Sequence, residues 1–294
     1  MSTGKPESRL GADYVDAIRE LIASMGSEER FKKSPAYLHW PYIGSRYFTA
    51  SRRVLYVGRA AYQGHWSQEL PTDIHDPAKV FDFLGGRIAD REPSDSLPGG
   101  CEKFFTQDPA GRAILKNRYF WKLLRVACAS LGVTASENED PFSSIAWSNL
   151  FKIAPLGAAN PPKWMRALEL AEGRAGSLLQ KEINALDPHV VIFVTGHTWM
   201  HEFWDEGSSS CLTGVAWIPD ADKWWEQPIH RVGHQSRRSG QPRLLVATAR
   251  PELRTRNVAL ARQVAPALKE LLQGWVLEQA RDAGTMSAGQ GAPP

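Results

Sequence analysis

Hydrophobic and polar positions follow two distinct periods along the chain. Four segments carry apolar residues at helical spacing, which predicts amphipathic helices over residues 12–31, 114–131, 163–186 and 257–280. Short β-rich apolar runs predict strands over residues 54–57, 142–153, 189–196, 215–219 and 242–252, and residues 197–204 are expected to form a short helix. Strands that alternate with long helices favour an α/β fold with a mostly parallel sheet.

The pattern predicts one domain, because no Gly/Ser/Pro-rich linker interrupts the middle of the chain. Residues 1–52 hold a helix and an aromatic segment that are expected to pack on the main domain of residues 53–281. Residues 282–294 are expected to form a disordered tail. Residues 67–111 are rich in Pro, Gly and Asp, and so long an irregular stretch is usually functional or mobile.

Composition narrows the class of protein. The 294 residues are 43% apolar and 23% charged, and no run approaches the ~20 apolar residues of a membrane span. Cys101, Cys128 and Cys211 fit neither a metal site nor a disulfide framework, and the first ten residues lack an apolar signal core. We therefore expect a cytoplasmic protein with no membrane association and no obligatory protein partner. The net charge of +3 is too small to establish a polyanionic partner, although basic residues gather in residues 250–256.

Polar, aromatic and glycine residues gather where the predicted strands end. The segments concerned are residues 58–66, 148–152, 196–199 and 249–257. Ligands of open α/β sheets bind beyond the carboxyl ends of the strands, so four such segments at one edge predict a pocket. Each segment alone has an ordinary explanation, because every strand needs a turn after it.

Three of these segments carry side chains suited to a nucleic acid. Tyr62 can stack on a planar ring, and the Asn149 amide can pair with a base edge through its donor and its acceptor. The start of the last helix offers phosphate-binding groups, namely Arg250, Arg254, Arg256 and Asn257. The alternatives are a tyrosine packed in a tight turn, an asparagine that caps a loop and a solvated run of charges. No P-loop, GxGxxG or GxSxG motif supports a nucleotide cofactor, a hydrolase or a transferase.

Eleven tryptophans is a high number for this length. Five of them stand in polar or Gly-rich contexts that suit the wall of a cleft: Trp66, Trp199, Trp204, Trp224 and Trp225. Core packing is the commoner role for any one of them, because large aromatic side chains dominate protein cores.

The four segments, in this order, resemble the motifs of the uracil-DNA glycosylase superfamily. After the strand RVLYV comes Gly58-Arg59-Ala60-Ala61-Tyr62-Gln63-Gly64, which keeps both glycines and the tyrosine of the family motif Gly-Gln-Asp-Pro-Tyr-His-Gly. Asn149 in WSNLFKIAP corresponds to the base-reading asparagine of the family. Arg250-Pro251-Glu252 stands where the family has His-Pro-Ser or Asn-Pro-Ser. The resemblance covers about residues 53 to 272.

This resemblance implies a three-layer α/β/α fold with a central, mainly parallel four-stranded sheet. It also implies a monofunctional DNA glycosylase, which flips a base out of DNA and hydrolyses its N-glycosidic bond without metal or cofactor. By the same resemblance, the flipped base is bound by Gly58, Arg59, Ala60, Tyr62, Gln63 and His197. The resemblance likewise implies that the catalytic residues are Asn149, Arg250 and Glu252 and that the DNA is held by Arg254, Arg256 and Asn257.

Two departures from the family motifs bear on the chemistry. Ala60 stands where an acid often activates water, and Arg250 replaces the histidine or asparagine of the second motif. Breaking the bond requires stabilisation of an oxocarbenium-like centre and of the departing base anion. Arg250 can supply positive charge near the base. The sequence does not decide which carboxylate orients the attacking water. Four residues could do so: Glu252, Glu69, Asp73 and Asp76.

Ala60 and Ala61 leave more room than Asp-Pro, which favours a modified pyrimidine larger than uracil. The superfamily includes an antiphage enzyme that removes glucosylated hydroxymethylcytosine from phage DNA, and this chain is similar to it in having an enlarged motif. Aromatic and polar faces for a glucosyl group are available from Tyr62, His65, Trp66, His197 and Trp199. The alternatives are a uracil-removing repair enzyme and a non-catalytic nucleic-acid-binding protein on the same fold, the latter favoured by Ala60 and Arg250.

Overall fold

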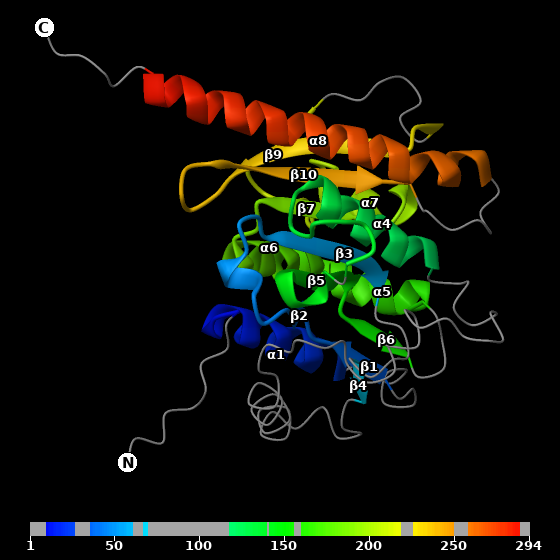
Figure 1. The fold of residues 1–294 in the computed structure, drawn as a ribbon. Coiled ribbons are helices and arrows are strands. Elements are labelled where there is room, and N and C mark those ends of the chain that lie inside the picture. Colours follow the sequence, from blue (N-terminus) through cyan, green and yellow to red (C-terminus); the bar gives the residue numbers. More distant parts are fainter. Residues whose placement is uncertain are drawn as a thin grey trace, which may run out of the picture.

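A seven-stranded mixed sheet lies at the centre of the computed structural model (Figure 1). The structure describes residues 10–26, 36–60, 67–69, 118–139, 141–155, 160–218, 226–249 and 258–288. The sheet has the order β2-β5-β3-β7-β10-β9-β8, built from Tyr42–Ile43, Ile145–Phe151, Val54–Ala60, Val190–Phe193, Pro242–Thr248, Ile229–Ser236 and Val215–Trp217. Its middle strands β5, β3, β7 and β10 are parallel, and β2, β9 and β8 add antiparallel edges.

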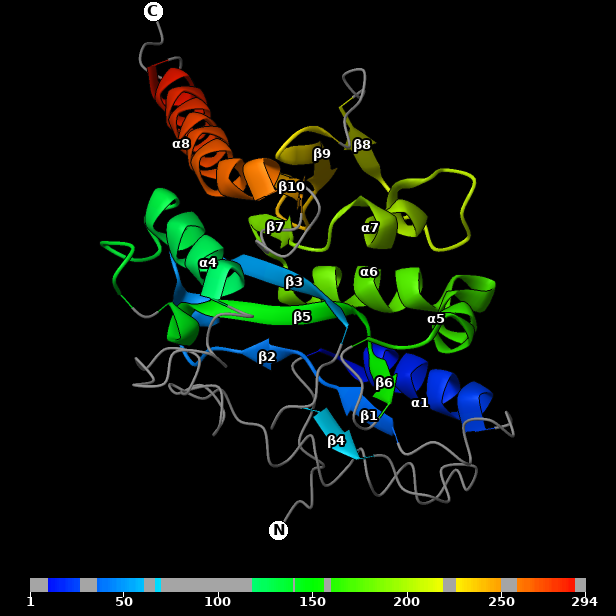
Figure 2. The ribbon, with the colours of Figure 1, turned by 90° about the vertical axis from the view of Figure 1, so that its right-hand side faces the viewer.

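Helices cover both faces of this sheet, which confirms the predicted α/β class (Figure 2). One face carries α4, Arg118–Ser130, and α8, Val258–Ala288. The other face carries α1, α5, α6 and α7, formed by Ala12–Gly26, Lys163–Leu170, Arg174–Leu186 and His197–Trp204. A small antiparallel sheet of order β4-β1-β6 lies beside α1, formed by Ser67–Glu69, Ala36–His39 and Ile153–Pro155.

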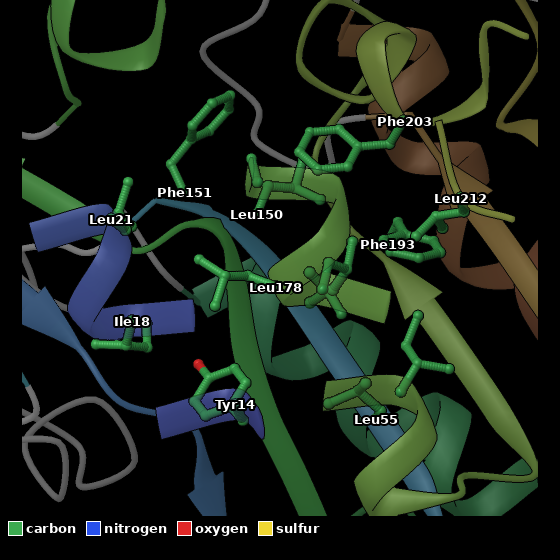
Figure 3. Close-up of a cluster of buried hydrophobic side chains, with 14 of the residues drawn as sticks. Tyr14, Ile18, Leu21, Leu55, Leu150, Phe151, Leu178, Phe193, Phe203 and Leu212 are labelled. Atoms are coloured by element: carbon green, nitrogen blue, oxygen red, sulfur yellow. The ribbon is translucent and has the colours of Figure 1, made fainter. Parts of the chain in front are cut away.

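Alternation along the strands explains why two core layers form. In β3, Leu55 and Val57 belong to the layer under α1 and α6, whereas Val54 and Tyr56 belong to the layer under α4 and α8. Figure 3 shows the first layer, in which side chains from α1, the strands, α6 and α7 meet. Each such aliphatic side chain contributes about 1.5–3 kcal/mol when it is fully buried. Strands buried on both faces read as continuous apolar runs, and this is why the sequence revealed them.

The expected four-stranded sheet is wrong in its strand number, since the described sheet has seven strands. β9 was not predicted, because its sequence, IHRVGHQS, mixes polar and apolar residues. The strand is also only partly buried. Its stability comes from pairing along nearly the whole of β10. β2 is two residues long and carries no periodic signal. The strand expected over residues 142–153 is also divided, into a 3-10 turn at Phe142–Ser144 followed by β5 and then β6.

The long helix expected over residues 163–186 is broken into α5 and α6. Glu172 and Gly173 take φ angles of 56° and 73°, which end one helix and start the next. A side chain at Gly173 would lie 2.3 Å from the Ser209 carbonyl oxygen, so a glycine is required where that loop crosses the helix. The break is therefore set by a tertiary contact that the helical periodicity does not contain.

The C-terminal helix is longer than predicted. α8 ends at Ala288, so residues 282–288 are helical, whereas the sequence placed them in a disordered tail. Its composition in this part, rich in Ala and Gly, has no apolar stripe that would mark a packed helix. The first helix was expected to run to residue 31; α1 ends at Gly26, and residues 27–35 lie outside the described residues.

An arginine cluster joins the amino ends of three parallel strands. The Asp187 carboxylate, at the end of α6, accepts from Arg53 at 2.6 Å, from Arg237 at 2.8 Å and from Arg243 at 3.4 Å. Burial raises the pKa of Asp187, but the hydrogen bond and charge of Arg237 and the charges of Arg53 and Arg243 outweigh it, so the pKa is lowered. This cluster lies at the sheet edge opposite the carboxyl ends, and its role is to hold β3, β7 and β10 together.

His189, beside this cluster, predicts a pH dependence of stability. Its Nδ1 accepts the Arg53 backbone N–H at 2.9 Å, and burial together with the charges of Arg237 and Arg53 lowers the pKa of His189 from 6.5 to about 4. The unfolded chain therefore takes up the proton first, so the free energy of unfolding should decrease as the pH falls from about 6.5 to 4. Urea denaturation across this range should show the decrease, and His189→Asn, which keeps an acceptor but does not titrate, should flatten it. An equal slope in both proteins would contradict this assignment.

Candidate functional site

The carboxyl ends of β5, β3 and β7 meet at one edge of the sheet. The chain passes from β3 outward to β5 on one side and then to β7 on the other side, so the strand order reverses at β3. Open α/β sheets bind ligands at such a reversal, outside the carboxyl ends of the strands. In Figure 1 the arrowheads of β3 and β10 point to the side of the molecule where α5 and α7 lie.

Gly58 and Asn149 face each other across this edge. They are register partners in the parallel pair of β3 and β5, and Asn149 is 3% exposed. A Cβ atom at Gly58 would lie 2.4 Å from Asn149 Oδ1, so the asparagine side chain occupies the space that the glycine leaves. β5 continues to Phe151, so Asn149 belongs to the strand and the alternative of an asparagine that caps a loop is wrong. A backbone ladder holds an amide more rigidly than a loop does.

A fully buried charged network lies directly behind Asn149. Lys152 Nζ donates to the Asn149 carbonyl oxygen at 2.6 Å and to Ser148 Oγ at 2.7 Å, and it forms an ion pair with Glu182 at 2.6 Å. Glu182 also accepts from the Tyr14 hydroxyl at 2.5 Å and from Ser148 Oγ at 2.8 Å. Burial lowers the pKa of Lys152, with Glu182 opposing the shift, and burial raises the pKa of Tyr14. The network joins α1, β5 and α6 beneath the strand end.

A second buried carboxylate fixes the chain just after the site. Glu169 of α5 accepts the backbone N–H of Lys152 at 2.7 Å and that of Ile153 at 3.1 Å. Lys152 lies between β5 and β6, and Ile153 is the first residue of β6. Burial raises the pKa of Glu169 to about 8, against the lowering effect of the two hydrogen bonds. Glu169 therefore replaces the missing ladder contacts at the exit of β5.

Trp199 forms an aromatic and cationic wall next to the strand ends. Its ring lies 5.3 Å from the Arg59 guanidinium carbon and 4.5 Å from that of Arg166. Phe151 meets the same ring edge-on at 5.6 Å. Arg59 comes from β3, Phe151 from β5, Arg166 from α5 and Trp199 from α7, so four elements converge here. Trp199 thus lines the site, the less common of the two roles that its sequence context allowed, and it also packs against the core.

His197 begins α7 at the end of β7 and is exposed to solvent. Its ring is perpendicular to that of the buried His230, with centroids 5.8 Å apart. Partial desolvation lowers the pKa of His197, and the charge of His201 lowers it further. A neutral imidazole at this position can donate or accept a hydrogen bond near neutral pH.

The structure brings together only part of the predicted site. Gly58, Arg59, the backbone of Ala60, Asn149 and His197 lie at the carboxyl ends of β3, β5 and β7. Several predicted residues lie outside the described residues: Tyr62, Gln63, Arg250, Glu252, Arg254, Arg256 and Asn257. The same holds for His65, Asp73, Asp76, Trp66, Trp224 and Trp225, and of Glu69 only the backbone is described. Trp204, proposed as a cleft residue, is 2% exposed and belongs to the core.

Sequence reasoning missed Tyr14, Lys152, Arg166 and Glu182. Lys152 carried a visible signal, since a lone lysine in the run NLFKIAP is unusual for a buried strand. The other three stand on helices, where a tyrosine or a charged residue is expected to face solvent. Only the packing of α1 and α6 on β5 brings Tyr14 and Glu182 together, and only the fold brings Arg166 of α5 to Trp199 of α7.

No family model matches the chain, and no curated protein is significantly similar to it. Among the described residues, no group of three or more His, Cys, Asp or Glu side chains is arranged to hold a metal ion. No helix in the described part combines the length and apolar character needed to cross a membrane.

Proposed function

We propose that this protein is a DNA glycosylase that flips a modified pyrimidine out of DNA and hydrolyses its N-glycosidic bond. The observation that carries the proposal is the buried Asn149 amide, which lies in the space left by Gly58 at the reversal of strand order. An amide with both a donor and an acceptor suits the recognition of one base edge. The motif resemblance supports the same assignment, with Asn149 as the base-reading residue.

The neighbouring groups fit the requirements of this reaction. Hydrolysis leaves the electron pair of the C1′–N bond on the base, so groups that donate hydrogen bonds or carry positive charge stabilise the departing anion. Asn149 can donate to it, and Arg59, held against Trp199, places a cation near the strand end. The water that attacks C1′ requires a carboxylate, for which Glu252 remains our candidate. His197 and Trp199, at the rim of the site, are suited to a bulky substituent such as a glucosyl group.

The proposal is tested by base release. Purified protein should produce abasic sites in DNA that contains glucosylated hydroxymethylcytosine, with slower or no release of uracil from matched oligonucleotides. Asn149→Ala should reduce the rate roughly 100-fold, because one preorganised donor to the leaving base is lost. The control is Asn184→Ala, which removes an exposed asparagine on α6 that accepts a hydrogen bond from Gln180.

The outcomes separate the alternatives. Faster release of uracil than of the bulky base would make the protein a uracil-removing repair enzyme. DNA binding without any abasic product would favour a non-catalytic nucleic-acid-binding protein. Equal activity of the wild type and Asn149→Ala would remove the assigned role of Asn149.

A further inference from the structure

A cavity of about 200 Å³ opens between α5 and α7, next to the end of β5. It is lined by Phe151, Trp199 and Thr198 on one side and by Lys163, Arg166 and Leu170 on the other. Phe151 stands two residues beyond Asn149, which places the cavity about 6.6 Å along an extended strand from the base-reading position. None of the site residues predicted from the sequence lies on α5.

Positive charge exceeds negative charge at this cavity. Lys163 and Arg166 are three residues apart on α5 and therefore share a helix face, and Arg166 lies 4.5 Å above the Trp199 ring. Glu202 also lines the cavity, but within the described residues neither basic side chain forms an ion pair with it. Arg166 Nε is buried and has no hydrogen-bond partner in the described part of the chain. A half-buried guanidinium with an unsatisfied N–H is poised for an acceptor.

We propose that this cavity binds a phosphate of the DNA strand, next to the nucleotide whose base lies at Asn149. This inference rests on the proposed function and names a contact of the same site. A guanidinium offers paired N–H donors that match two phosphate oxygens, and Lys163 adds a second charge. The Trp199 ring holds the Arg166 guanidinium in place, so little side-chain entropy is lost when a phosphate binds. The exposed Thr198 hydroxyl can donate a further hydrogen bond.

The phosphate is expected to belong to a strand rather than to a free anion, because the cavity adjoins the base-reading position. Arg59, which also lies against the Trp199 ring, continues the positive charge toward the end of β3. A DNA strand whose base lies at the ends of β3 and β5 would therefore meet two cations that share the same indole ring. Such phosphate contacts position the nucleic acid without selecting its sequence.

The test measures DNA affinity against salt concentration by fluorescence anisotropy. Removing the two positive charges at this phosphate in K163Q/R166Q should lower the magnitude of the slope of log affinity against log salt by about 1–2, and should weaken binding by about tenfold or more at low salt. The matched control K122Q/K181Q removes the same charge from α4 and α6, away from the cavity, and should leave the slope nearly unchanged. Thermal unfolding of each variant checks that the fold is retained.

Base release and phosphate binding, measured on the same variants, show which results would overturn the proposal. An unchanged salt slope in K163Q/R166Q, with base release intact, refutes the phosphate site and leaves the glycosylase function standing. A lowered slope in a protein that releases no base supports the phosphate site while the proposed function fails. Inorganic phosphate alone is titrated in parallel. If K163Q/R166Q weakens only that binding and leaves DNA binding unaffected, the cavity takes a free anion and the strand assignment is wrong.

Discussion

Replacing Glu182 by leucine is expected to lower the free energy of unfolding by about 3–5 kcal/mol, one of the two largest effects that the structure predicts. The reason is the complete burial of its partner: the Lys152 and Glu182 side chains are both 0% exposed. Without Glu182 the ammonium group loses its ion-pair partner and keeps only the charge of Glu169, with which it forms no ion pair in the described residues. The hydroxyls of Tyr14 and Ser148 also lose their acceptor. Urea denaturation of the wild type and the variant measures the difference.

A double variant separates the charge from the packing. Lys152→Met together with Glu182→Leu removes both charges and keeps a similar apolar volume, so most of the lost stability should return. Its rate of base release should be low, because Lys152→Met removes the hydrogen bond from Lys152 Nζ to the Asn149 carbonyl oxygen. A loss below about 1 kcal/mol in Glu182→Leu would contradict the buried ion pair. Recovery of full activity in the double variant would show that Lys152 does not position Asn149.

Gly58→Ala is expected to abolish most base release while it changes stability little. The added methyl group would lie 2.4 Å from Asn149 Oδ1, so the amide must leave its place above β3. A displacement of about 1 Å in a positioned group can cost roughly 100-fold in rate. The strand itself tolerates alanine, which is more favourable than glycine in a strand by about 0.5–1 kcal/mol.

Single-turnover base release and thermal unfolding test this expectation together. The control is Gly274→Ala in α8, where an added Cβ meets no atom within 4 Å. That variant should keep full activity and should be at least as stable as the wild type. A Gly58→Ala protein with unchanged activity would mean that Asn149 has no need of the space above the glycine, and the proposed site would then lose its central observation.

The predictable parts of the fold are those that the apolar pattern encodes locally. Val190–Phe193 is flanked by polar and glycine residues and buried on both faces, so its run of apolar residues could indicate only a short buried element. The same reasoning found β3, β10 and α7 near their observed bounds. It failed for β9, whose residues become a strand because β10 offers a free edge to pair with.

The candidate site was predictable in part for the same reason. Gly58 and Asn149 could be placed at strand ends, since parallel strands bring their carboxyl ends to one edge of a sheet. The sequence could not predict that the Asn149 side chain fills the space at Gly58. This contact depends on the register between two strands about 90 residues apart in the chain, and the elements packed around the two strands set that register. The partnership of Arg166 with Trp199 depended in the same way on where α5 lies after the break at Gly173.

The sequence by itself therefore determined the α/β class and most of the element order, and it indicated the edge of the sheet where we propose that a ligand binds. Those features follow from periodicity and chain direction, which are local properties. Only the tertiary structure decided that Tyr14, Lys152 and Glu182 form one buried network behind Asn149. Buried charges are stable only when partners from distant elements surround them, and such partners are brought together by folding and not by nearness in the chain.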